Sequence, residues 1–354
     1  MNFFIGKNLI SNSSKTYFIA DIAANHDGKI ERAKKLIYLA AKAGANAAKF
    51  QNFFAKTIVS DYGFKSLKKK LSHQSKWKKS IFKVYKDAEL PLSWTIELKK
   101  TCRSAGIDYL TAPYDSSIVN YLDKFVCAWK IGSGDITWHE HIMKIAKTQK
   151  PIIIATGASN LDEIEIIIKK VNKFNNKIVL MQCNTNYTAD IKNFKYINLN
   201  VLKLFKKKYP NIILGLSDHT PGHETVLGAI SLGARVIEKH FTDSNTRSGP
   251  DHFFSMNPKS WKEMVFASRK LEASLGSNIK KIEKNENSTV ILQRRTIRAN
   301  RVINCGEKIK KTDLCFLRPC PKRGLRPFEY YRIINKKAKK KINFHELINM
   351  RNTK

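Results

Sequence analysis

Acidic residues are scarce in this chain. Only 29 Asp and Glu stand against 65 Lys and Arg, which gives the 354 residues a formal charge of +36. Such an excess of positive charge would suit a nucleic acid or an acidic membrane surface. The densest lysine runs are far apart, however, and none carries the interleaved aromatic residues of a single-strand binder. We therefore expect no specific nucleic-acid partner, although a positive field would attract an anionic substrate such as a phosphoester.

Long apolar runs and paired cysteines are missing as well. No apolar stretch approaches the roughly 20 residues needed to cross a bilayer, and residues 1–14 lack the charged and apolar regions of a signal peptide. The six cysteines form no CxxC pair and no zinc-finger spacing. The sequence therefore predicts no membrane partner and a cytoplasmic location.

Short β-branched apolar runs recur along the chain, and helical patterns follow most of them. Eight runs are expected to be strands: 17–20, 47–51, 108–111, 128–131, 152–156, 178–182, 212–216 and 236–240. Eight strand–helix units predict an α/β fold whose parallel sheet closes into a (β/α)8 TIM barrel. A doubly wound sheet would also fit the alternation, but GxGxxG does not follow the first strand.

Two interruptions mark the organisation of the chain. Roughly 40 residues, from Asn52 to Leu92, separate the second strand from its helix, and an insertion at that end of a barrel strand is typical of a substrate-covering loop. After residue 275 the pattern becomes polar and then β-rich. We therefore expect a barrel domain over 1–276, a linker over 277–288 and a small β-rich domain over 289–354.

Polar residues gather at the ends of the predicted strands, where a barrel carries its chemistry. Period-two alternation puts Glu238 and His240 on one face, and Lys49 with Gln51 on another. If these faces point into the barrel mouth, Lys49 and Lys130 converge there with His219, His240 and Glu238. Two imidazoles with carboxylates and water suit a divalent ion such as Mn, Fe or Zn, and lysines suit a phosphate. Position alone predicts a metal-assisted barrel enzyme with an anionic substrate.

Several motifs at these strand ends resemble the sialic acid synthase family, which comprises N-acetylneuraminate, legionaminate and pseudaminate synthases. They occur in the expected order over nearly the whole chain: 24–28 (ANHDG), 130–134 (KIGSG), 155–157 (ATG), 215–220 (GLSDHT), 238–242 (EKHFT), 249–251 (GPD) and 255–258 (SMNP). The tail from Arg295 to about His345, with Arg318-Pro319 and Gly324, resembles the antifreeze-like (SAF, β-clip) domain of that family.

The resemblance implies a transferase that condenses phosphoenolpyruvate with an N-acetylmannosamine-like amino sugar and water, and that releases phosphate by C–O cleavage. It also implies a divalent metal, usually Mn with Mg, Co or Fe as alternatives, that activates the sugar aldehyde. The partners would be the two substrates and a second copy of the chain, in a domain-swapped homodimer whose SAF domain caps the partner's barrel.

The same resemblance assigns roles to individual residues. The catalytic residues would be Asp21, Glu238, His219 and His240, of which His219 and His240 would hold the metal. Phosphoenolpyruvate would be bound by Lys49, Lys130, Ser133, Thr156, Asn184, Thr185 and Ser217. The amino sugar would be bound by Gln51, Tyr187 and Asp251, and its N-acyl group by Arg318 of the other copy.

The chain departs from the family pattern at three places. Asp21 stands where sialic acid synthases usually carry Glu. Ala112 and Ala155 replace residues with phosphate-binding hydroxyls, although Thr111 and Thr156 are adjacent. The usual Thr-Asn order is reversed at Asn184-Thr185.

Three alternatives remain open at this stage. The first is a different phosphoenolpyruvate–aldose synthase that acts on phosphorylated aldoses. The second is a basic nucleic-acid-binding module, and the third is an inactive relative of the family. The SAF-like tail speaks against the first alternative, and the complete set of two lysines and two histidines speaks against the last.

Overall fold

The computed structural model describes residues 2–67, 74–75 and 77–354. The chain divides into two compact units, one ending at Gly276 and one from Ser277 to Lys354. Each unit has its own buried core. Within the described residues, no helix is both long and apolar enough to span a membrane.

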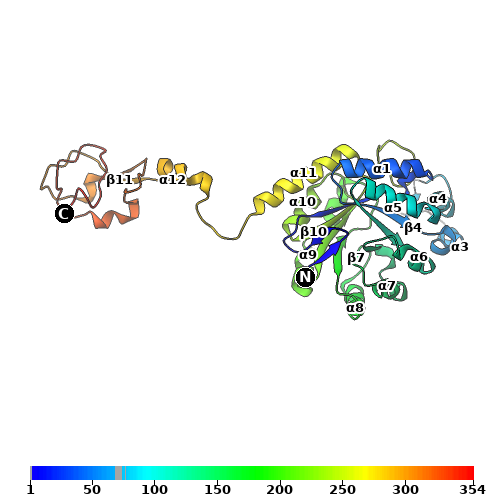
Figure 1. Cartoon of the computed structure of the whole chain (residues 1–354). Helices are drawn as coiled ribbons and strands as arrows, with labels where there is room; N and C mark the ends of the chain where they lie inside the picture. The colour runs from blue at the N-terminus through cyan, green and yellow to red at the C-terminus, as the bar shows by residue number, and fades with distance from the viewer. Residues whose placement is uncertain (1, 68–73, 76) are drawn as a thin grey trace. The chain divides into compact units, whose positions relative to one another are not determined.

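Eight parallel strands of the first unit close into a barrel in the order β10-β3-β4-β5-β6-β7-β8-β9 (Figure 1). Their bounds are β3 Tyr17–Asp21, β4 Ala47–Asn52, β5 Asp108–Pro113, β6 Trp129–Ile131, β7 Ile152–Ala155, β8 Ile178–Cys183, β9 Ile213–Asp218 and β10 Ala234–His240. All eight strands expected from the sequence are present, each with both ends within two residues of the expected position. The predicted (β/α)8 barrel is confirmed.

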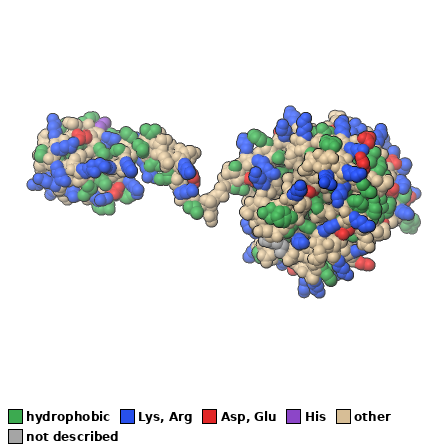
Figure 2. All heavy atoms as spheres, viewed as in Figure 1, with side chains coloured by type: hydrophobic (Ala, Val, Ile, Leu, Met, Phe, Trp, Pro, Cys, Tyr) green, Lys and Arg blue, Asp and Glu red, His purple; other side chains and the backbone are tan. Residues whose placement is uncertain are grey.

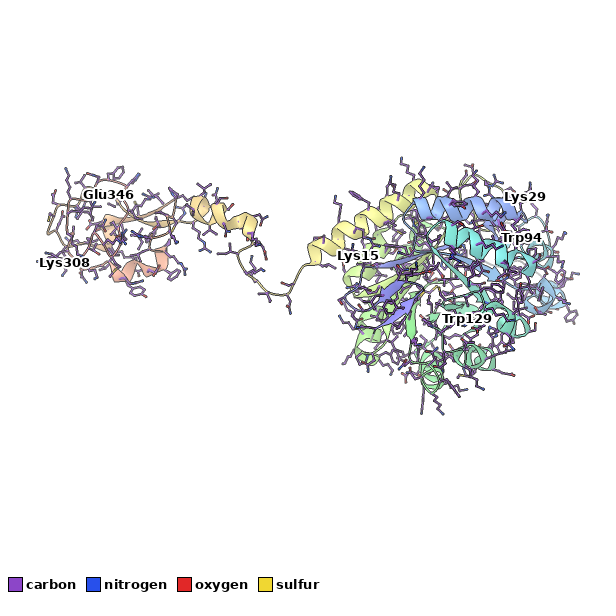
Figure 3. All side chains as sticks on the ribbon, in the orientation of Figure 1. Lys15, Lys29, Trp94, Trp129, Lys308 and Glu346 are labelled. Atoms are coloured by element: carbon purple, nitrogen blue, oxygen red, sulfur yellow. The ribbon has the colours of Figure 1, made fainter. Side chains whose placement is uncertain are left out.

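Helices follow the strands and surround the barrel in Figure 1. The main ones are α1 Ile30–Lys42, α5 Thr95–Ser104, α6 Val119–Asp123, α7 His139–Ala146, α8 Leu161–Val171, α9 Val201–Lys208, α10 Glu224–Ser231 and α11 Pro258–Leu275. Local chemistry fixes several starts: Asn160 caps α8 in a capping box with Glu163, and Asn257 caps α11. Lys29 and Trp94, labelled in Figure 3, directly precede α1 and α5.

Alternation along the strands separates two apolar layers. Side chains such as Phe18, Trp129 and Leu180 pack outward against the helices in the large core. Side chains of the opposite parity, such as Ile19 and Ile153, fill the inside of the barrel. Because the same inward rows end in polar residues, the chemistry is concentrated at the carboxyl end of the barrel.

A hairpin that the sequence analysis did not predict joins the inner layer. Strands β1 (Phe3–Ile5) and β2 (Asn8–Ile10) pair antiparallel, and Phe3, Ile5 and Ile10 belong to the same buried cluster as Tyr17 and the inward residues of the barrel. Three-residue strands carry too weak an alternation to be recognised from sequence. The hairpin supplies apolar side chains to the inner layer.

The described part of the long insertion after β4 contains short helices. It contains α2 (Ala55–Ile58), α3 (Asp61–Ser66) and α4 (Ile81–Asp87), and the short η3 (Leu92–Trp94) leads into α5. The side chains of Ser60 and Ser80 cap α3 and α4 by accepting backbone N–H groups.

The second unit is small and built largely from short pairings. Strands β11 (Thr296–Ala299) and β12 (Leu314–Leu317) form an antiparallel pair, and isolated bridges such as Ile303 with Ile342 add to it around an isoleucine-rich core. The structure differs from the expectation at its start: the expected linker 277–288 contains the turn η7 (Lys284–Glu286), and α12 (Asn287–Gln293) occupies residues expected to begin the β-rich region. The run 287–293 is too short for its period to be assigned from sequence.

Positive side chains are spread over both units. Figure 2 shows Lys and Arg scattered over the visible face of each unit, interspersed with polar and apolar side chains. The excess charge of +36 is therefore not gathered into one stripe on the face in view.

Candidate active site

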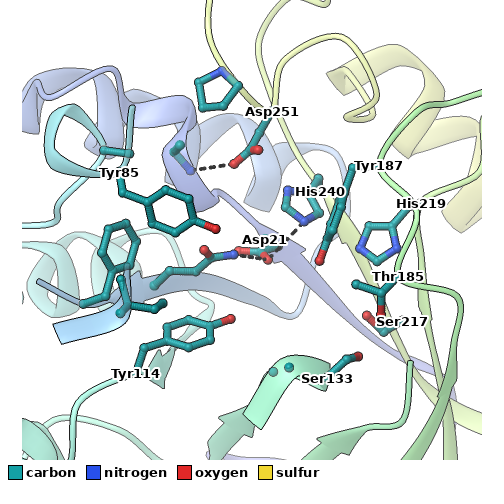
Figure 4. Close-up of a pocket in the computed structure, with 18 of the residues that line it drawn as sticks. Asp21, Tyr85, Tyr114, Ser133, Thr185, Tyr187, Ser217, His219, His240 and Asp251 are labelled. Carbon is teal, nitrogen blue, oxygen red and sulfur yellow. Dashed lines mark hydrogen bonds and ion pairs between the residues drawn. The ribbon is translucent and has the colours of Figure 1, made fainter. Parts of the chain in front are cut away.

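A pocket opens at the carboxyl end of the barrel strands, and residues from seven of the eight strand ends or the loops after them reach it (Figure 4). Of the residues predicted from the sequence, it brings together Asp21, Lys49, Gln51, Lys130, Ser133, Thr185, Tyr187, Ser217, His219, Glu238, His240 and Asp251. These residues are far apart in sequence, and barrel closure alone makes them neighbours.

Two lysines and two carboxyl groups form a buried network on the pocket floor. The Nζ atom of Lys49 lies 2.7 Å from Asp21 Oδ2 and 3.4 Å from Glu238 Oε2. The Nζ atom of Lys130 lies 3.4 Å from Glu238 Oε1 and 3.0 Å from the carbonyl of Ile131. All four charged side chains are at most 5% exposed, so their interactions are only weakly screened by water.

The network sets the ionisation of its members. Burial disfavours the carboxylate of Glu238, but Lys130 and Lys49 outweigh it and hold its pKa below the ordinary value. Burial likewise opposes the ammonium of Lys49, yet Asp21 and Glu238 raise its pKa. For Lys130, which has one carboxylate neighbour within ion-pair distance among the described residues, burial prevails and lowers the pKa. Glu238 is therefore ionised at neutral pH.

His219 and His240 face each other across one side of the pocket, with ring centroids 5.4 Å apart. Burial, His219 and Lys49 hold the pKa of His240 well below its ordinary value, so this imidazole is neutral. Its Nδ1 is buried without a hydrogen bond to any described residue. For His219, burial lowers the pKa, but contact with the Cys183 side chain outweighs burial, so the pKa lies above its ordinary value. Nδ1 of His219 lies 3.0 Å from the carbonyl oxygen of Asn184.

These two imidazoles fit a divalent cation. Neutral histidine nitrogens are common ligands of Mn, Fe and Zn, and Nδ1 of His240 is a buried nitrogen without a hydrogen-bond partner among the described residues. Among the described residues, no group of three or more His, Cys, Asp and Glu could hold a metal. A cation here would therefore take its remaining ligands from water and substrate.

Hydroxyl groups from the carboxyl ends of β6, β8 and β9 line the pocket. Ser133, Thr185 and Ser217 follow or end β6, β8 and β9, and Ser133 Oγ accepts the N–H of Gly157 at 3.1 Å. Glycine is needed at position 157, since a Cβ there would stand 1.9 Å from Thr185 Oγ1 and 3.0 Å from Ser133 Oγ. This close approach keeps the hydroxyls of Ser133 and Thr185 together.

Two residues predicted to bind phosphoenolpyruvate do not line this pocket. The hydroxyl of Thr156 donates to the carbonyl of Met181 at 2.9 Å, and the side-chain amide of Asn184 points to the carbonyl of Tyr196 at 3.4 Å. Among the described residues, Thr185 lines the pocket, whereas Thr156 and Asn184 do not. Of the pair Asn184-Thr185, the threonine hydroxyl is the one that faces the pocket.

Alternation along the strands explains why Thr156 points away. Ala155 and Ala112 have the inward parity, so the adjacent Thr156 and Thr111 point outward. The hydroxyl of Thr111 donates to the carbonyl of Phe50 and to Asn52 Oδ1. Neither threonine replaces the hydroxyl lost at the neighbouring alanine, because a shift of one residue along a strand reverses the face.

Three further lining residues are those predicted to face the sugar. Gln51 donates to Asp21 Oδ2 at 3.1 Å, and the ring of Tyr187 packs edge-on against His219 with centroids 4.4 Å apart. Asp251 accepts the N–H of Ala24 at 3.1 Å, drawn as a dashed line in Figure 4. Burial raises the pKa of Asp251 from 3.8 to about 6, because the N–H of Ala24 compensates the charge only in part.

The raised pKa of Asp251 predicts a gain in stability for Asp251→Asn at high pH. In the folded protein this carboxyl ionises only near pH 6, so between pH 4 and 6 the native state holds a proton that the unfolded chain loses, and wild-type stability falls as pH rises. At pH 8 the variant should be more stable by roughly 1–3 kcal/mol. Below about pH 4 both states are protonated, and the difference should vanish. Urea denaturation at pH 8 and pH 4 measures it, and a difference that is the same at both pH values would contradict this origin.

Several lining residues were not predicted individually. Tyr85 comes from α4 and Phe53, Gln74 and Trp77 from the rest of the insertion, which was expected to cover the substrate. Tyr114 lies after β5, and Figure 4 shows Tyr85 and Tyr114 across the pocket from His219. Asp135 follows Ser133, and burial raises its pKa to about 6. The KIGSGD run was the only sequence signal for Asp135, and aromatic residues in an insertion carry no strand-end signal.

Arg318 belongs to the second unit, where it follows β12 and precedes Pro319. It was predicted to act on the barrel of another copy. That role stays a prediction.

A family model described as the NeuB family matches residues 36–280. The N,N'-diacetyllegionaminic acid synthase of Campylobacter jejuni is 35% identical over 94% of this chain and 99% of its own length. The pseudaminic acid synthase of the same organism is 32% identical over 94% and 95% of the two chains. Among solved structures, the N-acetylneuraminic acid synthetase of Leptospira borgpetersenii superposes with a TM-score of 0.71 at 26% identity, covering 82% of this chain and 95% of that one.

Proposed function

Since the chain belongs to the NeuB family, we propose that it is a synthase of a sialic-acid-type sugar acid that condenses phosphoenolpyruvate with an N-acyl amino sugar aldehyde and water. The observation that carries the proposal is the buried floor of Lys49, Lys130, Asp21 and Glu238 beside two facing histidines. Relatives named for legionaminic, pseudaminic and N-acetylneuraminic acids support the class of product.

The charges of the site match such a substrate once a cation is counted. The formal charges of the two lysines and two carboxyl groups on the floor cancel, and Asp135 and Asp251 add two more carboxyl groups to the lining, whereas phosphoenolpyruvate carries a phosphate and a carboxylate. A buried site binds such an anion only if the anion is compensated. A divalent cation on His219 and His240 would supply that excess positive charge, and Mn is our first candidate.

Binding and orientation follow from the two sides of the pocket. Lys130, with Ser133, Thr185 and Ser217 on the adjacent wall, would bind the phosphate, and Lys49 would bind the carboxylate. Gln51, Tyr187 and Asp251 would hold the amino sugar with its aldehyde carbon towards the methylene carbon of phosphoenolpyruvate. Holding two reactants in line contributes up to about 7–11 kcal/mol in favourable intramolecular models.

The first bond formed joins the methylene carbon of phosphoenolpyruvate to the aldehyde carbon. The aldehyde oxygen gains the electron pair and then a proton, and the carbon that carries the phosphate becomes electron-poor. When bound, a divalent cation supplies Lewis-acid polarisation of a carbonyl oxygen. His219 and His240 are the residues that would hold it beside the acceptor.

Water then adds to the electron-poor carbon. Glu238 is ionised and lies between the two lysines, so it can accept the proton that the water loses, and Asp21 is the second candidate for this step. The resulting tetrahedral carbon expels phosphate by breaking its C–O bond, and the remaining hydroxyl becomes the keto group of the 2-keto acid. Lys130 stabilises the departing phosphate.

We also propose that the second unit is an SAF-type domain and that the active assembly is a homodimer in which Arg318 of one copy reaches the N-acyl group in the other. Support comes from the tail motif Arg318-Pro319 and from relatives covered along 94% of this chain. A guanidinium suits this role because its fixed donors can hold an amide carbonyl in one orientation.

Phosphate release tests the proposed function. Protein loaded with Mn would be incubated with phosphoenolpyruvate and one acceptor at a time: N-acetylmannosamine, the legionaminate precursor or the pseudaminate precursor. We expect release that depends on one of these sugars, together with a nine-carbon 2-keto acid identified by its mass. Release with a phosphorylated aldose instead would favour the other class of synthase. Folded, metal-loaded protein that releases none with any sugar would contradict the proposal.

A further inference from the structure

The loops that follow β3 and β10 are joined by hydrogen bonds and ion pairs centred on Asp27. His252 Nε2 lies 2.9 Å from Asp27 Oδ1, while Arg247 NH2 and Arg32 Nε lie 3.0 Å and 2.8 Å from Asp27 Oδ2. Arg32 extends the cluster through its two terminal nitrogens to Asp243. Three donors, two from the loop after β10 and one from α1, therefore converge on a single carboxylate that takes no part in the proposed reaction.

His252 is the buried member of this cluster. Its side chain is 0% exposed, and its second ring nitrogen, Nδ1, lies 2.7 Å from the hydroxyl of Thr242. Both nitrogens are thus engaged, so the ring cannot turn without losing two hydrogen bonds. The backbone packs directly on the ring: a Cβ at Gly249 would stand 2.6 Å from His252 Cδ2.

A second connection joins the same two loops inside the pocket. Asp251, the neighbour of His252, accepts the N–H of Ala24, which lies three residues before Asp27. This contact involves the carboxyl that faces the proposed sugar site. Burial disfavours the charge of that carboxyl, so an untethered loop would let Asp251 turn towards water. The pairing of Asp27 with His252 opposes that movement.

We propose that Asp27 and His252 are positioning residues that hold the carboxyl of Asp251 in the acceptor site. The pair fixes the backbone of one loop against the other, and the Ala24–Asp251 contact transmits that placement to the pocket. The proposal rests on the proposed function for the nature of the acceptor, but its geometry is independent of the reaction.

A double-mutant cycle tests it in the full chain with Mn. Asp27→Asn should raise the KM for the amino sugar about tenfold and leave the KM for phosphoenolpyruvate unchanged. His252→Gln should act in the same direction. In an Asp251→Ala background, Asp27→Asn should add less than about twofold, because the residue it positions is gone. Equal increases in both KM values, or effects that simply multiply in the double variant, would overturn the proposal.

The control is Lys35→Ala. Lys35 Nζ lies 3.6 Å from Asp243 Oδ2 and its side chain is 63% exposed, so it belongs to the same cluster without touching Asp27 or His252. We expect both KM values of this variant to equal those of the wild type. An effect as large as that of Asp27→Asn would assign the result to the surface charge rather than to the position of Asp251.

A readout independent of turnover separates this proposal from the proposed function. The N–H of Ala24 donates to Asp251, so its hydrogen exchange reports whether the carboxyl is in place. Exchange at Ala24 should accelerate about tenfold or more in Asp27→Asn and in His252→Gln, and should not change in Lys35→Ala. Unchanged exchange in the first two variants would overturn the proposal, even for a chain with no synthase activity.

Discussion

Lys130→Met should lower kcat/KM for phosphoenolpyruvate by about a thousandfold while the barrel stays folded. The ammonium group is buried, with its side chain 3% exposed, and it contacts Glu238 Oε1, the same oxygen that accepts the hydroxyl of Ser217. Truncating one partner of a buried charge pair at a binding site costs about 2–5 kcal/mol of binding, and every 1.4 kcal/mol is a factor of ten. Steady-state phosphate release at varied phosphoenolpyruvate concentration measures the effect.

The fold should tolerate this change because the buried carboxylate of Glu238 still has a cationic partner, Lys49, whose Nζ lies 3.4 Å from Glu238 Oε2. The matched control is Lys150→Met, since Lys150 is a half-buried lysine that pairs with Asp123 at 3.0 Å and precedes β7 at the other end of the strands. It should retain wild-type kinetics. A loss of less than about tenfold in Lys130→Met, with a thermal midpoint equal to that of the wild type, would remove Lys130 from the phosphate site.

His240→Ala should abolish metal-dependent turnover, with a loss of at least about a hundredfold in kcat. The neutral imidazole is one of two proposed ligands, and Lewis-acid stabilisation of a developing charge contributes several kcal/mol. His219→Ala should behave in the same way. Titration calorimetry with Mn should show weaker binding in both variants, so that the loss of metal is measured apart from the loss of activity.

His139→Ala is the matched control for the histidine variants. His139 begins α7 outside the pocket, and its Nδ1 lies 2.9 Å from Lys170 Nζ. Metal affinity and turnover should both be unchanged in this variant. Full activity of the wild type after complete removal of divalent ions would contradict the role of His219 and His240.

The barrel was predictable because its signals are local and repeated. Each strand is a short β-branched run bounded by polar loops, and eight of them in order leave few other folds. The hairpin Phe3–Ile5 with Asn8–Ile10 was missed because its strands are only three residues long. Helix α12 was missed for the same reason, since seven residues define no period.

The candidate site was predictable to the extent that strand parity could be read. Lys49, Glu238 and His240 share the inward parity, and the structure brings them together. Thr156 was predicted to bind phosphoenolpyruvate because it is adjacent to Ala155 in the sequence. Adjacent residues of a strand face opposite sides, so the side chain of Thr156 points away from the pocket. Residues of the insertion, such as Tyr85, could not be predicted to line the pocket without knowing how the insertion folds. The pairing of Asp27 with His252 could not be predicted either, because it joins two loops more than 200 residues apart in sequence.

The fate of the bridging oxygen of phosphoenolpyruvate tests the central claim most directly. The substrate would carry oxygen-18 in the C–O–P bridge, and the phosphate released with the preferred amino sugar would be analysed by mass. Condensation with C–O cleavage predicts that the released phosphate retains the heavy oxygen. Unlabelled phosphate, with the heavy oxygen left in the keto acid, would show P–O cleavage and contradict the proposed reaction.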